Sequence, residues 1–231
     1  MFSRNFYYRI KYQIEKKAPF QVFFHFVLDR IQHPFTKFQK KIHRNLHQNY
    51  LKNKQTTTDY FSINTYYWNK IISKNFKEFS YLEIGSWEGN SALYILKNYK
   101  TNNVLCVDLW EKNNEINKNF ENFKLNIEDF KNRLTFFREK SDSFFTNNKE
   151  KFDVIYIDGS HESMQVYKDI NNAWNFLNVD GIIICDDYFY GNIYAESNNV
   201  PADGINKFIK EKNNLKIICV NNSQIFLKKI K

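Results

Sequence analysis

The stretch Phe152-Asp-Val-Ile-Tyr-Ile-Asp-Gly-Ser-His161 joins a run of apolar residues to a polar turn. Apolar residues at consecutive positions predict a strand at 154–157 that is buried on both faces, as in a parallel sheet covered by helices. A helical stripe follows the turn at Val166, Ile170 and Ala173. The segment is therefore one strand–turn–helix step of an α/β fold, and its polar residues come directly after the strand.

The same alternation extends in both directions along the chain. Further strands are predicted at 81–84, 104–107, 134–137 and 182–185. Helical patterns lie at 92–99, 116–130, 143–147, 166–177 and 205–209. Two last strands, 216–220 and 224–227, are too close together for a crossover helix and should pair antiparallel. The predicted fold class is α/β, with a Rossmann-like seven-stranded sheet, helices on both faces, a C-terminal antiparallel strand pair and an N-terminal helical extension.

Positive charge is concentrated at the N-terminus. Residues 1–55 carry twelve Lys and Arg and two acidic residues, whereas the remainder carries twenty-two and twenty-three. Helices are predicted around 20–31, ending at Pro34, and around 38–50, and a third at 59–74 leads into the body. We therefore divide the chain into a basic, aromatic-rich helical extension, 1–58, and a Rossmann-like domain, 59–231.

Composition excludes several classes of protein. With 231 residues, 42% of them hydrophobic, the chain can bury a sizeable core, which argues against global disorder. The three Cys lack the spacing of a metal or redox site and fall in predicted strands, as expected for buried reduced thiols in a cytoplasmic protein. The longest N-terminal apolar run, Ala18–Leu28, is too short to span a bilayer, and no cleavage site follows it.

Ligands of open α/β sheets bind beyond the carboxyl ends of the strands. After the first strand comes Glu83-Ile-Gly-Ser-Trp-Glu-Gly-Asn-Ser91, whose glycine lets the backbone approach a ligand but which is not the G-x-G-x-x-G dinucleotide fingerprint. Asp108, after the second strand, could accept hydrogen bonds from two ribose hydroxyls or cap a helix. Lys140-Ser-Asp-Ser143, after the third strand, suits contacts with adenine or simple capping.

Three carboxylates, Asp158, Asp186 and Asp187, follow the fourth and fifth strands. Like charges at one sheet edge repel and raise one another's pKa. A hard divalent cation would remove this conflict, and oxygen ligands suit Mg²⁺, Ca²⁺ or Mn²⁺. The alternative is that one carboxylate caps a helix and another is solvated.

Taken together, these turns resemble those of class I S-adenosylmethionine-dependent methyltransferases. Within this group the resemblance is to the metal-assisted O-methyltransferases that include the catechol and macrocin enzymes. The motifs that carry it are Glu83-x-Gly85, Val107-Asp108, Phe152–His161 and Asp180-Gly-Ile-Ile-Ile-Cys-Asp-Asp187, over about residues 60–228. The chain departs from this pattern at Trp87 and Glu88, where many relatives have small residues. It also has Tyr188 and Phe189 where some sugar-modifying members have a His after the double Asp.

The resemblance implies that S-adenosylmethionine is the cofactor and gives roles to individual residues. The methionine end would be lined by Glu83, Gly85 and Ser86, and Asp108 would hold the ribose. The adenine would be bordered by Leu109 or Trp110 and Ser141. A divalent cation, Mg²⁺ in the first instance, would be held by Asp158, Asp186 and Asp187.

A methyl acceptor hydroxyl must lose its proton, and His161 is the predicted base. It is the only His after residue 47, and it follows Asp158, the other predicted catalytic residue, by three positions. The alternative is that His161 hydrogen-bonds the loop or caps the next helix. The implied activity is O-methylation of a sugar or another hydroxylated small molecule in the cytoplasm.

The basic extension leaves rival functions open. A nucleic-acid methyltransferase would use it to neutralise phosphates, and the aromatics of Phe2–Tyr12 could stack on bases. Against this, Asp158-Gly-Ser-His161 stands where such enzymes often carry an Asn-Pro-Pro-Tyr-like loop. A non-enzymatic module would dock the extension on an anionic membrane or an acidic partner. We rank a helical lid or homo-oligomer arm first, peripheral membrane contact second and nucleic acid last.

Overall fold

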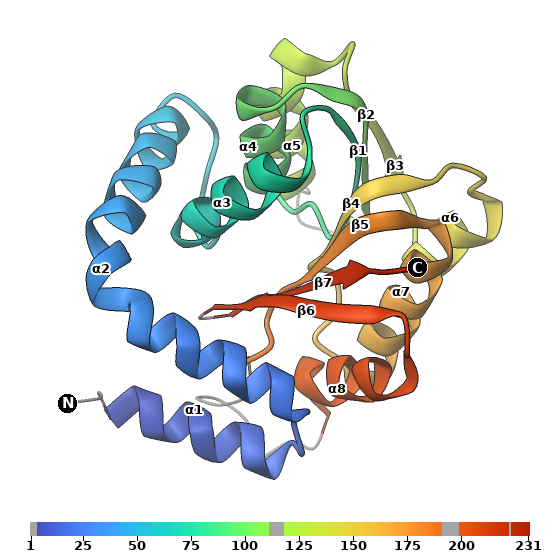
Figure 1. Cartoon of the computed structure of the whole chain (residues 1–231). Helices are drawn as coiled ribbons and strands as arrows, with labels where there is room; N and C mark the ends of the chain where they lie inside the picture. Colours follow the sequence, from blue (N-terminus) through green and yellow to red (C-terminus); the bar gives the residue numbers. More distant parts are fainter. Residues whose placement is uncertain (1–3, 111–117, 191–198, 222) are drawn as a thin grey trace. The chain divides into compact units, whose positions relative to one another are not determined.

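The computed structural model describes residues 4–110, 118–190, 199–221 and 223–231. The start of the helix predicted at 116–130 lies outside these residues. The described strands are β1 (Phe79–Ile84), β2 (Thr101–Asp108), β3 (Thr135–Arg138), β4 (Phe152–Ile157), β5 (Leu177–Cys185), β6 (Leu215–Val220) and β7 (Ile225–Lys229). They form a seven-stranded sheet of order β3-β2-β1-β4-β5-β7-β6, as the α/β prediction requires (Figure 1).

Helices alternate with these strands as the apolar stripes predict. The described helices are α1 (Arg4–Glu15), α2 (Phe20–Leu51), α3 (Thr65–Asn75), α4 (Asn90–Asn98), α5 (Lys118–Ile127), α6 (Ser141–Asn147), α7 (Ser163–Phe176) and α8 (Pro201–Glu211), with 3-10 turns η1 (Ser62–Asn64) and η2 (Glu128–Phe130). None of the helices in the described ranges combines the length and the apolar character that crossing a bilayer demands.

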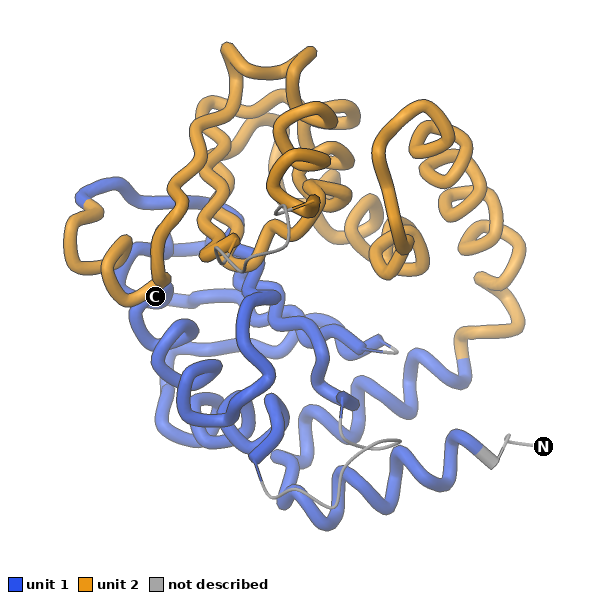
Figure 2. The backbone as a smooth tube through the Cα atoms, turned by 180° about the vertical axis from the view of Figure 1, so that it is seen from behind, with its two compact units in different colours: residues 1–31, 149–231 blue, residues 32–148 orange. Residues whose placement is uncertain are grey.

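The chain packs as two compact units, coloured separately in Figure 2. Unit 1 comprises residues 1–31 and 149–231, and unit 2 comprises residues 32–148. This partition reflects packing within the chain, and the division at residue 58 into an extension and a Rossmann-like domain stays a prediction. Each unit is described by itself below.

Unit 2 contains the parallel strands β1, β2 and β3. Leu82 pairs with Leu105 in β2, and Cys106 pairs with Phe136 in β3. Most side chains of β1 are buried, including that of Glu83, as expected for a strand covered on both faces. The strands place Glu83 and Asp108 at the carboxyl ends of β1 and β2.

Unit 1 contains β4 and β5 in parallel, followed by the antiparallel pair β6–β7. Tyr156 pairs with Ile184, and β7 lies antiparallel to both β5 and β6, so the predicted C-terminal strand pair is confirmed. The turn between β6 and β7 is closed by Asn221, whose side-chain oxygen accepts the backbone N–H groups of Ser223 and Gln224. This turn brings Gln224 to the start of β7.

The N-terminal helices differ from the prediction in two respects. Pro34 does not end a helix, because α2 continues through it to Leu51. A proline inside a helix costs about 3 kcal/mol. Burial of residues on both sides, including Val22, Phe26 and Leu51, outweighs this cost at about 1.5–3 kcal/mol for each large side chain.

Helix α1 forms where no helix is predicted. Its inward face is mainly polar and aromatic, with Tyr12 and Gln13 buried, so an apolar stripe does not mark it. Within unit 1, Lys16 forms an ion pair with Asp203 at 3.0 Å, and the Tyr12 ring lies 5.9 Å from that of Phe189. Polar and aromatic contacts therefore hold this helix.

Candidate functional site

In unit 2, the carboxylate of Asp108 is the acceptor for three backbone N–H groups. Ser86 and Trp87 donate to Oδ2 at 2.8 and 2.9 Å, and Trp110 donates to Oδ1 at 2.8 Å. The side chain thus ties the turn after β1 to the end of β2. Each oxygen of a carboxylate has two lone pairs, so Oδ1 keeps capacity for a ligand hydroxyl.

The turn after β1 needs glycine at both ends. Gly85 and Gly89 have φ values of 90° and 85°, a region that side chains rarely adopt. A Cβ on Gly89 would also lie 3.0 Å from the ring of Phe123. Trp87, between them, has φ of 48° and is 51% exposed. The bulky residue that departs from the family pattern therefore points its side chain to solvent.

Glu83 is completely buried at the end of β1. The hydroxyl of Tyr81 donates to Oε2 at 2.5 Å, and the hydroxyl of Ser91 donates to Oε1 at 2.9 Å. Burial raises the pKa of Glu83 to about 7, although these hydrogen bonds oppose the rise. Glu83 is therefore a buried acid whose charge depends on pH in the neutral range.

The predicted adenine neighbours differ in exposure. Leu109 is 36% exposed, and Ser141 is half-buried as the first residue of α6. Trp110 is buried, with φ of 36°, and its ring centroid lies 4.6 Å from that of Phe123 and 6.0 Å from that of Phe136. Its indole N–H donates to the carbonyl of Trp87 at 2.8 Å. Trp110 thus packs into unit 2 and braces the turn.

Glu88, the second departure from the family pattern, links this turn to the segment before α3. It is completely buried and accepts the backbone N–H of Thr57 at 2.8 Å and the amide of Asn122 at 2.7 Å. Asn126 donates to the carbonyls of Gln55 and Glu88. The acidic residue at position 88 therefore has a structural role within unit 2, because it accepts hydrogen bonds from Thr57 and Asn122.

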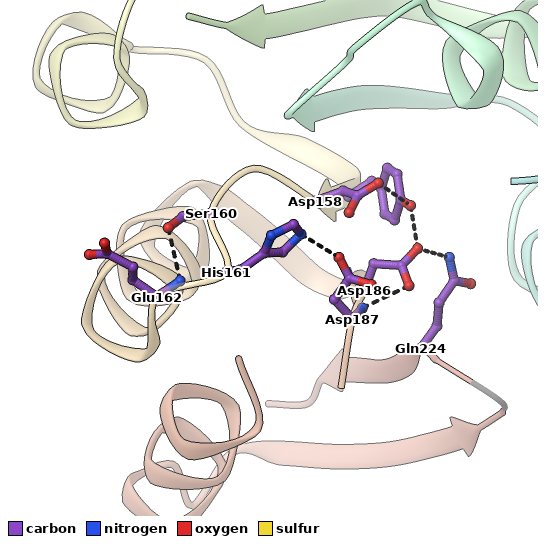
Figure 3. A network of polar contacts seen from close by, with 8 residues as sticks. Asp158, Ser160, His161, Glu162, Asp186, Asp187 and Gln224 are labelled. Atoms are coloured by element: carbon purple, nitrogen blue, oxygen red, sulfur yellow. Dashed lines mark hydrogen bonds and ion pairs between the residues drawn. The ribbon is translucent and has the colours of Figure 1, made fainter. Parts of the chain in front are cut away.

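In unit 1, the hydroxyl of Tyr156 lies between two carboxylates. These are Asp158 and Asp186, which are labelled in Figure 3. The hydroxyl contacts Asp158 Oδ2 at 2.8 Å and makes a short contact with Asp186 Oδ2. Burial raises the pKa of Tyr156 well above its ordinary value, so the phenol stays protonated. One phenolic hydrogen cannot be donated to both carboxyls at once, so the two acceptors share it.

Asp186 has further partners in unit 1. The amide of Gln224 donates to Oδ2 at 2.6 Å, and the backbone N–H of Asp187 donates to Oδ1 at 2.8 Å. Burial, and next the negative charge of Asp187, raise the pKa of Asp186 above its ordinary value. The expected repulsion among these carboxylates is thus present at Asp186.

His161 forms an ion pair with the third carboxylate. Its Nε2 lies 2.8 Å from Oδ2 of Asp187, and its ring stacks on Tyr190 with centroids 4.1 Å apart. The hydrogen bond to Asp187 raises the pKa of His161 above its ordinary value, and burial opposes the rise. Asp187 has φ of 56°, which Asp tolerates better than most residues. The contact orients the imidazole and directs Nδ1 away from Asp187.

In unit 1 the types of side chain favour a metal ion, but their arrangement does not. Three carboxylates are suitable ligands for a hard divalent cation. However, across the described ranges no three His, Cys, Asp or Glu side chains form a group that could hold a metal ion. Asp158 and Asp186 share the phenol of Tyr156, and Asp187 faces His161. The carboxylates are thus occupied by protein donors, and the cation stays a prediction.

Several polar residues of these networks were not predicted. Tyr81 and Tyr156 each stand two positions before an acid at the end of a strand, so the period of two places both side chains on one face. That Tyr-x-acid spacing is a readable signal. Gln224 and Tyr190 carry no such signal, because Gln224 meets Asp186 from 38 positions along the chain.

Comparisons with known proteins agree with this fold. Residues 82–188 match the family described as a methyltransferase domain. A sequence relative is an uncharacterised protein of Acanthamoeba polyphaga mimivirus, 29% identical over 119 residues, which cover 48% of this chain and 52% of that protein. The chain thus spans about half the length of the curated relative that it matches.

Solved structures share the fold at low sequence identity. A provisionally assigned O-methyltransferase from Klebsiella pneumoniae has a TM-score of 0.60 at 13% identity, over 90% of this chain and 97% of that chain. An O-methyltransferase from Bacillus cereus, in complex with SAH, has a TM-score of 0.57 at 14% identity, over 91% and 100%. TomG from Streptomyces achromogenes, an O-methyltransferase involved in tomaymycin synthesis and in complex with SAM, has 0.54 at 11%, over 69% and 75%.

Proposed function

We infer from the match of residues 82–188 to a methyltransferase domain that this chain transfers the methyl group of S-adenosylmethionine to a hydroxyl oxygen. The observation that carries the oxygen-directed proposal is the contact between His161 Nε2 and Asp187 Oδ2 at 2.8 Å. A half-exposed imidazole that is oriented by a carboxylate is a suitable base for a hydroxyl proton.

The proposed transfer is a single displacement. When bound, S-adenosylmethionine would supply an electrophilic methyl group to the acceptor oxygen, and the electron pair of the broken carbon–sulfur bond would stay on sulfur as a neutral thioether. The hydroxyl proton goes to Nδ1 of His161, and Asp187 stabilises the resulting imidazolium. Positioning the two reactants supplies much of the rate enhancement in such a step.

The cofactor residues of the proposal lie in unit 2. Asp108 would accept a hydrogen bond from the ribose, because three backbone N–H groups fix its carboxylate while leaving acceptor capacity. The methionine end would lie against Glu83, Gly85 and Ser86. The adenine would lie near Leu109 and Ser141, with Trp110 supporting the turn from within the aromatic cluster.

A divalent cation, with Mg²⁺ as the first choice, is a separate part of the proposal. Asp158, Asp186 and Asp187 would hold it, and the raised pKa of Asp186 supports this part because a cation would relieve the repulsion. When bound, such an ion lowers the pKa of a coordinated hydroxyl and orients it.

The acceptor proposed is a sugar or another hydroxylated small molecule. O-methyltransferases among the structural neighbours, including one involved in tomaymycin synthesis, support a small acceptor. The resemblance to sugar-modifying methyltransferases supports a glycan precursor within this class.

The test begins with calorimetry of the full chain with SAM and SAH, followed by transfer of radiolabelled methyl groups to panels of sugars and phenols. We expect saturable binding of both nucleosides and label on a hydroxyl oxygen of at least one small acceptor. Absence of heat with both nucleosides would overturn the methyltransferase proposal. Label appearing only on RNA or DNA nitrogen would overturn the choice of acceptor.

The metal is tested apart from the transfer itself. Turnover is measured after exhaustive chelation and after readdition of Mg²⁺, while SAM binding is followed by calorimetry. We expect chelation to suppress turnover, Mg²⁺ to restore it, and cofactor affinity to stay unchanged. Full turnover in excess chelator would remove the cation from the proposal and leave the His161–Asp187 pair in place.

A further inference from the structure

The part of α2 that belongs to unit 2 exposes a row of large apolar side chains. The row consists of Phe35, Phe38, Ile42 and Leu46, which are 85%, 74%, 41% and 62% exposed. Spacings of three, four and four residues place all of them on one side of an α-helix. Scattered apolar residues are normal on a protein surface, but a continuous row on one helix face is not.

The opposite side of the same segment makes the packing contacts within unit 2. His47 and Leu51 are buried, and the ring of His43 lies 5.8 Å from that of Tyr66. Lys40 extends over the ring of Tyr67, with its ammonium 4.6 Å from the centroid. Since the core-facing side is already defined by these residues, the apolar row is not needed to attach α2 to unit 2.

Positive charge accompanies the row. Lys37, Lys41 and Arg44 are exposed, and no acidic residue occurs between positions 30 and 58. An α-helical repeat of 100° per residue places these cations on the arc between the apolar row and the packed side, with Lys41 next to the row and Arg44 nearest the packed side. We call these seven residues, Phe35, Lys37, Phe38, Lys41, Ile42, Arg44 and Leu46, the outer face of α2.

We propose that the outer face of α2 docks on an anionic lipid surface. An interfacial helix buries an apolar row at the boundary between headgroups and acyl chains while flanking cations meet anionic headgroups. Each Lys or Arg near such a surface contributes measurably to binding. The outer face carries the apolar row and, along one flank of it, the cations.

The charges disfavour two other occupants. A symmetric contact between two copies would set the same patch against itself and bring six cations together without an acid in this part of the helix. A nucleic acid would use the cations but leave Ile42 and Leu46 without a matching partner, because phosphate contacts are polar. Only a surface that is both anionic and apolar complements the whole face.

The test is cosedimentation of the full chain with vesicles. We expect at least tenfold stronger binding to vesicles that contain about one-third phosphatidylserine than to phosphatidylcholine alone. The variant Lys37→Glu/Lys41→Glu/Arg44→Glu should bind the anionic vesicles about 100-fold more weakly or worse. Phe35→Ser/Phe38→Ser/Leu46→Ser should lose at least tenfold at unchanged charge.

Matched controls alter the same residue types elsewhere. Leu125→Ser/Met164→Ser replaces exposed apolar residues, and Lys149→Glu/Lys168→Glu/Lys210→Glu reverses exposed charges. Both controls should bind like the unmodified chain. All variants are compared for thermal melting and for SAM affinity, so that unfolding is separated from lost docking.

Three results would overturn the proposal. One is vesicle binding that is unaffected by both outer-face variants. Another is a serine variant that converts a dimer to a monomer in sedimentation equilibrium without weakening vesicle binding. The third is tight binding to single-stranded RNA that depends on the cations but not on the apolar row, together with no binding to anionic vesicles. None of these results affects the methyltransferase proposal.

Discussion

Strands β1 and β4 end in the same spacing, Tyr81-Leu-Glu83 in unit 2 and Tyr156-Ile-Asp158 in unit 1. In each, the tyrosine hydroxyl lies against the acid two positions later, at 2.5 and 2.8 Å. Glu83 has its own second donor, Ser91, whereas Asp158 shares its tyrosine with Asp186. In the first network one carboxyl accepts from two hydroxyl donors, and in the second two carboxyls share one phenolic hydrogen.

This difference suggests a division of labour between the two networks. A carboxyl whose donors are complete is suited to hold a fixed geometry, as Glu83 and Asp108 do around the turn after β1. Carboxyls that share a donor gain most from an added proton or cation, as Asp158 and Asp186 would. We therefore expect changes in unit 2 to act on cofactor binding and changes in unit 1 to act on turnover.

The largest expected effect is on turnover. Replacement His161→Ala removes the proposed base and should lower kcat by about 10²–10⁴-fold, while SAM affinity stays within about twofold. Methyl-transfer rates and calorimetry on the same preparation measure both quantities. Met164→Ala, an exposed neighbour on the following helix, serves as the control. Loss of SAM affinity in step with kcat would place His161 with the cofactor residues instead.

The next effect is on cofactor affinity. In the unmodified chain three backbone N–H groups donate to the carboxylate of Asp108, and Asp108→Asn would place an amide NH₂ among these donors. We expect SAM binding to weaken by about 100-fold, because hydrogen bonds to charged groups contribute about 1.5–3 kcal/mol. The rise in Tm that saturating SAM produces should disappear. Asp180→Asn, at an exposed position, should keep it. An unchanged rise in the Asp108 variant would remove Asp108 from the cofactor site.

Glu83 makes stability depend on pH. The pKa of its carboxyl is raised from 4.5 to about 7 in the fold, so between these values the native state holds a proton that the unfolded chain has lost. The free energy of unfolding should therefore fall as pH rises from about 4.5 to about 7, by on the order of 3 kcal/mol, and then level off. Urea melts across this range would show a flatter profile for Glu83→Gln, and identical profiles would contradict the burial effect.

The smallest expected effect is on stability, and it compares Tyr156 with Tyr81. Tyr156→Phe and Tyr81→Phe each remove one buried hydroxyl and should cost about 1–3 kcal/mol of stability. Added Mg²⁺ should restore the Tm of Tyr156→Phe, because a cation would replace the shared hydrogen, but should leave Tyr81→Phe unchanged. Equal responses to Mg²⁺ in thermal melts would mean that the two networks do not differ in this way.

Local pattern alone determined much of this molecule. Consecutive apolar residues at 154–157 and 182–185, and a largely apolar run at 81–84, predict buried parallel strands, because such runs are stable only when both faces are covered. The short gap before the last strand predicts its antiparallel pairing, and the polar residues after each strand indicate where ligands bind. These features depend on residues that are close together in the sequence, so they can be predicted from the sequence alone.

The tertiary structure decided what depends on distant partners. Pro34 is accommodated within α2 because residues on both sides of it are buried, and α1 is held by contacts such as Lys16 with Asp203. Gln224 reaches Asp186 only through the pairing of β5 with β7. The distant partners of these carboxylates are set by folding across many residues rather than by the local pattern.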